Sequence, residues 1–282
     1  MNTKNRLSIV IGSGGVLCAA SLGLNKALHR EGLTPGMAVG CSGGSIYAAS
    51  IALGIDPAQI EDQTLTLFTS DVFEGYTSNL KSALTGETRF TELSSLIDDK
   101  IMYERLKAVF GDKTFDDTIF PLHIVATDLY TGERVVISSG KILDAVRASV
   151  AIPMIFSPWK IGDQLLVDGA VCDPLPIDVA IQQGSDVIAA VGFEMPTRKR
   201  MNSYTAVTTH FNGIYMNNIL KSTFAFYNIA HHAEIIPILP EFEKPIGTFD
   251  TAQIPFIIAQ GEKAAEAQIP YIKKLMSNGG LK

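Results

Sequence analysis

The chain has 282 residues, 46% of them hydrophobic and 18% charged, with a formal net charge of -6. This composition excludes a disordered chain, and the acidic balance gives no electrostatic basis for binding nucleic acid or an anionic membrane. No apolar run reaches the roughly 18 residues of a transmembrane helix. The polar start at 1–6, followed by a short apolar stretch, does not fit a signal peptide.

The three cysteines, Cys18, Cys41 and Cys172, cannot all pair with one another, and their spacing fits no zinc site. We therefore expect a reducing, cytoplasmic setting, with no metal and no other cofactor. Nucleic acid is not an expected partner, and the sequence leaves the oligomeric state open.

The first predicted elements are a strand at 7–11, the run Gly12-Ser13-Gly14-Gly15 and a helix at 19–30. This order resembles a phosphate-binding loop, but Leu17 stands where the Rossmann pattern needs its third glycine, and no Gly-Lys-Ser/Thr follows for a P-loop. What remains is a group of backbone N–H donors at a helix N-terminus, which suits a developing oxyanion. The alternative is a plain tight turn.

The second strand, turn and helix contain Gly40-Cys41-Ser42-Gly43-Gly44, a Gly-x-Ser-x-Gly sequence after a short apolar strand that ends at Val39. This is the pattern of a nucleophile elbow, a strained strand-to-helix turn that presents a serine hydroxyl at the edge of a sheet. Glycines on both sides relieve the crowding of such a bend. The alternative is a glycine-rich loop with an incidental serine.

Beyond this turn, helices and strands alternate, which predicts an α/β domain with a mostly parallel sheet. Asp56 and Pro57 are expected to begin a helix that runs to about Phe68. The segment 70–92 is irregular, and we expect a surface loop or a cap over a site. The remaining elements are expected to be a helix at 98–110, strands at 122–126 and 134–137, a helix at 142–150, a strand at 165–167, a helix at 177–183 and a strand at 187–193.

At 202–230 the sequence predicts a long helix whose apolar residues cover more than half of its circumference. So wide an apolar face is typical of a buried helix; the alternative is that part of it lines an acyl-chain pocket or meets an interface. A strand at 235–239 and a helix at 253–277, interrupted near Pro270, complete the chain. Nothing marks a linker, so we expect a single domain over 1–282, with a core at about 7–193 and the elements of 200–282 packed on it.

A serine nucleophile needs a group that takes its proton, most often a histidine held by a carboxylate. None of the five histidines lies in a loop directly after a late strand, where such a residue would be expected. Asp168 is better placed, because it follows the strand at 165–167 and precedes Gly169. An aspartate within hydrogen-bond reach of Ser42 can act as the base itself. On spacing alone, Asp168 could equally be an ordinary Asp-Gly turn residue.

Over most of its length the chain resembles the bacterial patatin-like phospholipases. Four segments carry the resemblance in order and spacing: Gly40 to Gly44; Ala126-Thr127-Asp128-Leu129 with Thr131-Gly132-Glu133; Ala145-Val146-Arg147-Ala148-Ser149-Val150-Ala151-Ile152-Pro153; and Val167-Asp168-Gly169-Ala170 followed by Pro174-Leu175-Pro176.

The resemblance implies a three-layer α/β/α sandwich and a Ser–Asp dyad without a catalytic histidine. Ser42 would be the nucleophile and Asp168 the general base, with an oxyanion hole from the backbone amides of Gly14, Gly15 and Gly43 and no metal. The implied substrates are acyl esters of phospholipids or lysophospholipids, and a peripheral contact with a membrane would fit them.

Three rival functions stay open at the sequence level. The chain could be an acyltransferase to an alcohol or lysolipid, or a lipid-binding or regulatory protein whose catalysis has weakened. A histidine-triad hydrolase is the third rival. The second is motivated by Leu17 and Cys18, which replace the basic residue and the last glycine of the family's glycine-rich strip.

The resemblance would also bring all three cysteines near the site. We expect them to be small buried apolar groups. Their clustering motivates a redox role as a further hypothesis.

Overall fold

The computed structural model describes residues 7–87, 89–195, 200–242, 246 and 250–277. Its centre is an eight-stranded sheet in which β5-β6-β3-β2-β1-β7-β8 follow one another and β4 also pairs with β3. The strands are β1 (Leu7–Ile11), β2 (Met37–Cys41), β3 (Leu122–Asp128), β4 (Arg134–Ile137), β5 (Trp159–Ile161), β6 (Gln164–Asp168), β7 (Val187–Val191) and β8 (Glu234–Ile238). The pairs among β3, β2, β1, β7 and β8 are parallel, whereas β4, β5 and β6 pair antiparallel. The expected mostly parallel sheet is confirmed.

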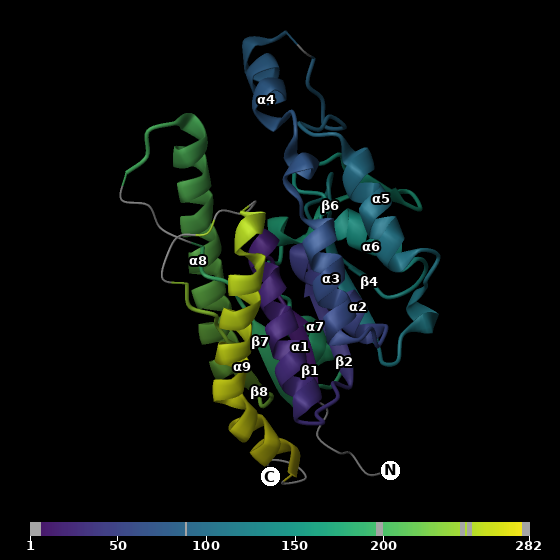
Figure 1. Ribbon diagram of the computed structural model, residues 1–282, viewed down its shortest axis with the longest axis vertical. Coiled ribbons are helices and arrows are strands. Elements are labelled where there is room, and N and C mark those ends of the chain that lie inside the picture. Colours follow the sequence, from purple (N-terminus) through teal and green to yellow (C-terminus); the bar gives the residue numbers. More distant parts are fainter. Residues whose placement is uncertain (1–6, 88, 196–199, 243–245, 247–249, 278–282) are drawn as a thin grey trace.

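Helices cover both faces of the sheet, because side chains from alternate positions of the central strands enter two separate cores (Figure 1). The larger core packs α1 (Ala20–Arg30), α2 (Gly43–Ala52), α3 (Pro57–Leu67), α5 (Asp99–Phe110), α6 (Ile142–Ser149) and α9 (Ile254–Ser277). The smaller core, on the opposite face, packs α7 (Ile177–Gln182) and α8 (Tyr204–Ala230). The expected α/β/α layering is therefore confirmed.

The C-terminal helix α9 lies along α1, and two glycines allow the close approach (Figure 1). A Cβ at Gly23 would lie 2.1 Å from the Glu262 nitrogen, and one at Gly261 would lie 2.0 Å from the Ala20 carbonyl oxygen. No side chain fits between these backbones. This contact fixes α9 against the helix that follows the glycine-rich strip.

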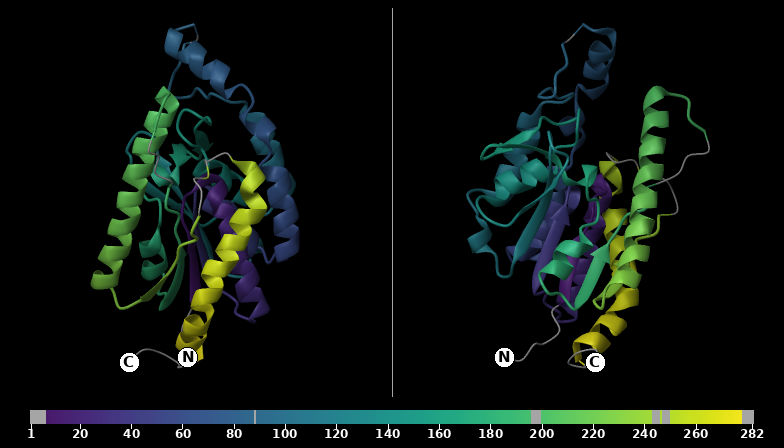
Figure 2. Two further views of the ribbon diagram at one scale, coloured as in Figure 1. Left: turned by 60° about the vertical axis from the view of Figure 1, so that its left-hand side comes forward. Right: turned by 180° about the vertical axis from the view of Figure 1, so that it is seen from behind.

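Three expectations about individual elements are wrong. The 70–92 segment, expected to be irregular, contains the helix α4 (Tyr76–Thr85), which has no buried residue and projects from the body of the molecule (Figure 2). Helix α9 continues through Pro270 without the expected interruption. Helix α8 forms as predicted, but much of its apolar face is exposed rather than buried.

Among the described residues, no helix has the length and apolarity needed to cross a membrane.

Candidate active site

Ser42 occupies the sharp turn between β2 and α2 predicted from the Gly-x-Ser-x-Gly sequence. Its backbone adopts φ 55° and ψ -134°, a region that L-residues rarely enter and that costs on the order of 1–3 kcal/mol. Space for the bend comes from its neighbours. A Cβ at Gly40 would lie 2.6 Å from the Ser45 Cα, and one at Gly44 would lie 2.4 Å from the Ile11 carbonyl oxygen. The strained turn is therefore held by close backbone packing on both sides.

The register of β3 explains why Ser42 and Asp168 meet although they lie 126 positions apart in the sequence. On β3, Val125 pairs with Cys41 of β2, and the next residue, Ala126, pairs with Asp168 of β6. Both β3 residues also pair with β4, so β2 and β6 must share the remaining edge of β3. Strand β6 runs antiparallel and ends where β2 ends. Asp168 therefore lies beside the turn that carries Ser42.

The two side chains are in direct contact and nearly out of solvent. Ser42 Oγ donates a hydrogen bond of 2.6 Å to Asp168 Oδ2, and the two residues are 5% and 2% exposed. The other carboxylate oxygen, Oδ1, accepts the Ala170 N–H at 2.8 Å. Both carboxylate oxygens are thus engaged, and their orientation is fixed.

Burial raises the pKa of Asp168 to about 7, against the opposing effect of the hydrogen bonds from Ser42 and Ala170. Desolvation disfavours the charged carboxylate more than these two donors stabilise it. A carboxyl group with this pKa is partly ionised at neutral pH. It can both accept a proton and return it under the same conditions.

A second serine, Ser149, holds the backbone of the Ser42 turn through hydrogen bonds. The Ser42 N–H donates to Ser149 Oγ at 2.9 Å, and Ser149 Oγ in turn donates to the Val125 carbonyl oxygen at 2.7 Å. Ser149 is fully buried at the end of α6. The sequence contained it within a family segment but gave it no role. Its contacts link the strained backbone of Ser42 to β3.

The glycine-rich strip after β1 lies against the first turn of α2. A Cβ at Gly43 would lie 2.8 Å from the Gly15 carbonyl oxygen, and one at Gly44 would lie 2.5 Å from that of Gly12. The strip is anchored by hydrogen bonds from the Gly12 and Ser13 N–H groups to the carbonyl oxygens of Val191 and Pro174, at 2.9 and 2.8 Å.

Within the described part of the chain, the N–H groups of Gly14 and Gly15 donate no hydrogen bond. Gly15 has φ 56°, a left-handed conformation that favours glycine. The strip therefore offers backbone donors close to the turn that carries Ser42.

The two residues that depart from the family pattern lie inside the protein. Leu17 and Cys18 are both buried, and Cys18 Sγ donates to the Gly12 carbonyl oxygen at 3.4 Å. A Cβ at Gly43 would lie 3.0 Å from the same sulfur atom, so Cys18 fills the space between the strip and α2. Apolar packing replaces the cation and the glycine of the family pattern at this position.

The cysteines do not form a reactive group. Burial raises the pKa of the Cys18 and Cys41 thiols, and partial burial of the sulfur raises that of Cys172. All three are therefore protonated at neutral pH, whereas redox-active cysteines are thiolates. The expectation that all three are buried holds for Cys18 and Cys41 but is wrong for Cys172, which is exposed.

The histidines are separate from the site, because neither Ser42 nor Asp168 hydrogen-bonds to one. Among the described residues, no cluster of His, Cys, Asp or Glu could hold a metal ion.

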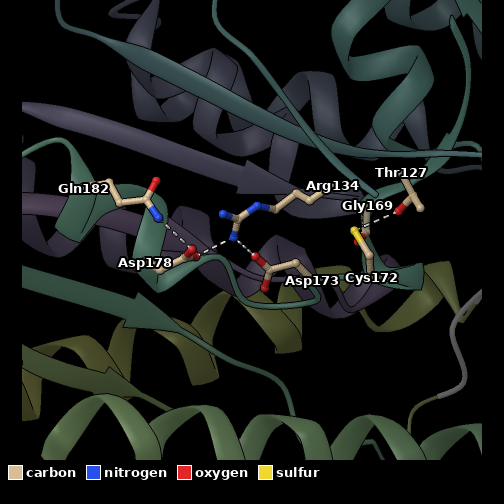
Figure 3. A network of polar contacts seen from close by, with 7 residues as sticks. All are labelled: Thr127, Arg134, Gly169, Cys172, Asp173, Asp178 and Gln182. Carbon is tan, nitrogen blue, oxygen red and sulfur yellow. Dashed lines mark hydrogen bonds and ion pairs between the residues drawn. The ribbon is translucent and has the colours of Figure 1, made fainter. Parts of the chain in front are cut away.

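An ionic network anchors the segment that follows Asp168 (Figure 3). Arg134 of β4 places one nitrogen, Nη1, 2.6 Å from Asp173 Oδ2 and 2.6 Å from Asp178 Oδ1. Burial raises the pKa of Asp173, and the two carboxylates raise that of Arg134. The next residue, Pro174, accepts the hydrogen bond from Ser13. The network thus fixes the short link between Asp168 and the glycine-rich strip. Sequence reasoning missed it, because no local pattern joins β4 to this segment.

Comparisons with known proteins assign the chain to a family. The sequence profile described as patatin-like phospholipase matches residues 9–181. An uncharacterized NTE family protein of Mycobacterium tuberculosis is 27% identical over 240 residues, which cover 81% of this chain and 59% of the relative. Patatin-like phospholipase domain-containing protein 7 of Mus musculus is 28% identical over 194 residues, covering 68% of this chain and 14% of that protein. The chain thus spans less than two thirds of these relatives.

A solved structure shares the fold. Human GIVD cytosolic phospholipase A2 superposes with a TM-score of 0.54 at 10% sequence identity, covering 98% of this chain and 59% of that one. At this identity the likeness concerns the fold alone. The family assignment comes from the sequence match, which includes the glycine-rich strip, the Ser42 turn and Asp168. The chain belongs to the patatin-like phospholipase family.

Proposed function

We propose that this protein is a lipid acyl hydrolase that cleaves acyl esters of phospholipids or lysophospholipids, with Ser42 as nucleophile and Asp168 as general base. The observation that carries the proposal is the 2.6 Å hydrogen bond between Ser42 Oγ and Asp168 Oδ2. It joins a strained, glycine-flanked serine to a buried carboxylate in a family whose name describes phospholipases.

In the first half-reaction, Ser42 Oγ attacks the ester carbonyl carbon while its proton passes to Asp168 Oδ2. The carbonyl oxygen becomes an oxyanion, which the amides of Gly14, Gly15 and Gly43 would stabilise; one such donor is typically worth about 3 kcal/mol. The ester C–O bond then breaks, and the leaving alcohol takes the proton from Asp168. In the second half, Asp168 removes a proton from water as the water oxygen attacks the acyl-enzyme carbonyl carbon. The bond to Ser42 Oγ then breaks, Asp168 returns the proton to Ser42 Oγ, and the fatty acid is released.

The raised pKa of Asp168 supports its role without a histidine. A general base works best when its pKa lies near the working pH, and burial raises the pKa of the Asp168 carboxyl group to about 7. The carboxylate is then a strong enough base to take the serine proton during attack. It is also a strong enough acid to return it to the leaving alcohol.

The reaction is tested by product analysis with the purified chain. We expect hydrolysis of p-nitrophenyl butyrate and release of free fatty acid from phosphatidylcholine. Glycerol or lysophosphatidylcholine is added in parallel as an acyl acceptor. Acyl transfer to either one in place of free acid would replace the hydrolase by an acyltransferase. Phosphatidylcholine binding without turnover of either ester would instead support the lipid-binding alternative.

The pH dependence of hydrolysis should report Asp168. Because the base must be ionised, kcat/KM for a neutral ester is expected to rise with pH and level off above pH 7. Below that point it should fall about tenfold per pH unit, since the protonated fraction increases in that proportion. The measurement is a pH profile on p-nitrophenyl butyrate, with circular dichroism confirming the fold at each pH. A limb near the ordinary aspartate pKa of about 4 would contradict the assignment.

A further inference from the structure

Helix α8 carries a continuous stripe of exposed apolar side chains. At 100° per residue, the exposed residues fall within roughly one third of the circumference. They include Phe211, Tyr215 and Phe226, which are 52%, 65% and 61% exposed. Between them the stripe holds uncharged polar residues such as Asn218 and Ser222. The members that define this α8 stripe are Tyr204, Val207, Phe211, Tyr215, Ile219, Phe226 and Ile229.

The fold alone does not account for the length of this helix. Helix α8 connects the parallel strands β7 and β8, each of 5 residues and thus ~17 Å long. Its own 27 residues span ~40 Å, more than twice the distance that the crossover needs. Its N-terminal half therefore extends beyond the carboxyl ends of the strands, the end where Ser42 lies (Figures 1 and 2).

The opposite side of α8 is firmly attached beside the candidate active site. Asn217 makes two hydrogen bonds to the Met195 backbone, at 2.7 and 2.9 Å, and Leu220 is buried against Gly192. Met216 and Leu220 line a small cavity together with Gly12 and Ser13, part of the glycine-rich strip. Ser13 Oγ is buried there without a hydrogen-bond partner among the described residues. The α8 stripe is thus the outer face of a helix whose inner face borders the site.

Charge and area decide between the possible occupants of the stripe. Within α8, Lys221 is the only residue of the types Asp, Glu, Lys and Arg. Its Nζ lies 3.9 Å from Oε1 of Glu194, which precedes the helix. The stripe is therefore neutral, although the chain as a whole carries a net charge of -6. A stripe ~10 Å wide on a ~40 Å helix offers roughly 400 Å², about half of what each partner contributes to a standard protein interface. A second copy of the chain would therefore be held poorly.

A bilayer surface suits the same features. Phenylalanine, tyrosine and isoleucine partition into the boundary between head groups and acyl chains, and an amphipathic helix can lie flat in that boundary. We infer that the α8 stripe docks this protein on a zwitterionic lipid surface, with the stripe against the lipid and the axis of α8 parallel to the membrane. This inference rests on the proposed lipid substrate. Because the stripe is neutral, binding depends on apolar insertion and not on anionic head groups.

The test is co-flotation of the full chain with phosphatidylcholine vesicles. Wild type is expected to float with these vesicles, and neither added phosphatidylglycerol nor raised salt should strengthen the binding. The double variant Phe211→Asn/Phe226→Asn should bind at least ~10-fold more weakly, because two half-exposed aromatic side chains no longer insert. Its hydrolysis of soluble p-nitrophenyl butyrate should be unchanged, since neither residue contacts the cavity or the dyad.

Ile119→Asn is the matched control, because Ile119 is 64% exposed but lies in the turn that leads into the start of β3. It should bind vesicles like wild type. An independent measurement uses Phe211→Trp, whose emission should shift to the blue with vesicles. Wild type, with its one tryptophan at Trp159, should show no such shift.

Three outcomes would overturn the inference. They are equal binding by wild type and the double variant, absence of wild-type binding, and a wild-type dimer that the double variant converts to a monomer. The last outcome would assign the stripe to a second copy of the chain. If wild type does not hydrolyse soluble p-nitrophenyl butyrate, the proposed function is refuted, whatever the vesicle binding shows.

Discussion

Replacing Asp168 by asparagine is expected to lower kcat for ester hydrolysis by ~10³–10⁴-fold with little change in KM. Asparagine keeps the size of the side chain, and its amide oxygen can still accept the Ala170 N–H. It cannot take a proton from Ser42 at neutral pH. The substitution therefore removes the base while leaving the substrate surface unchanged. Steady-state kinetics on p-nitrophenyl butyrate measure the effect, and Ser42→Ala should lose at least as much activity.

The same variant should be more stable than wild type above pH 7. The pKa of Asp168 is raised in the folded state to about 7, so the unfolded chain loses this proton at lower pH than the folded one. Stability therefore falls as pH rises from about 4 to 7, and the ionised carboxylate destabilises the fold above that range. The gain from Asp168→Asn should be on the order of 2–4 kcal/mol at pH 8 and should vanish below about pH 4. Denaturant unfolding at several pH values measures it.

Asp128→Asn provides the matched control, since Asp128 lies on β3 in the part that pairs with β6, near Asp168, but is outside the dyad. Its carboxylate accepts the N–H groups of Tyr130 and Thr131, which lower its pKa. Removing that charge should reduce stability at neutral pH and leave activity intact. Asp168→Asn, in contrast, should raise stability and abolish most of the activity. Full activity in Asp168→Asn would contradict the assignment of the base.

Gly43→Ala is expected to lower kcat by ~10²–10³-fold in a protein that still folds. The new methyl group would lie 2.8 Å from the Gly15 carbonyl oxygen, closer than real Cβ contacts, and at a tight 3.0 Å from Cys18 Sγ. The strip must then move away from α2, and the amides of Gly14 and Gly15 move with it. Oxyanion stabilisation depends on donors held within a few tenths of an ångström, so kcat should fall more than KM changes.

A second substitution distinguishes this effect from general damage to the core. Cys18→Gly restores the glycine of the family pattern and removes the sulfur that a Gly43 methyl group would meet. The double variant Cys18→Gly/Gly43→Ala should therefore be faster than Gly43→Ala alone. A double variant with the same or lower kcat would show that contact with Cys18 is not the cause. Wild-type activity in Gly43→Ala would remove Gly43 and the strip from the proposed oxyanion hole.

Local sequence patterns predicted the elements that depend on local geometry. The turn at Ser42 could be predicted because glycines must flank a backbone at φ 55°, and the buried strands because their residues are apolar at successive positions. The family and the layered fold followed from motif order and from alternating elements. The contact between Ser42 and Asp168 could be expected only from the resemblance. Its structural cause is the shared edge of β3, and long-range register leaves no trace in the sequence near either residue.

Other features depended on tertiary packing that the sequence does not encode locally. Helix α8 has an apolar pattern on most of its circumference, which fits burial equally well, but the sheet covers only its inner face. Arg134 looked like an ordinary strand residue until the fold placed two carboxylates beside it. Leu17 broke the family pattern in sequence. In the structure it packs in the core, where a cation would be costly.

Fluorophosphonate labelling followed by peptide mapping tests the Ser42–Asp168 pair most directly, because the reagent forms a covalent bond only with an activated serine. We expect a single label on Ser42 in wild type, strongly slowed labelling in Asp168→Asn and none in Ser42→Ala. Labelling of a different serine, or equal labelling rates in wild type and Asp168→Asn, would contradict this expectation.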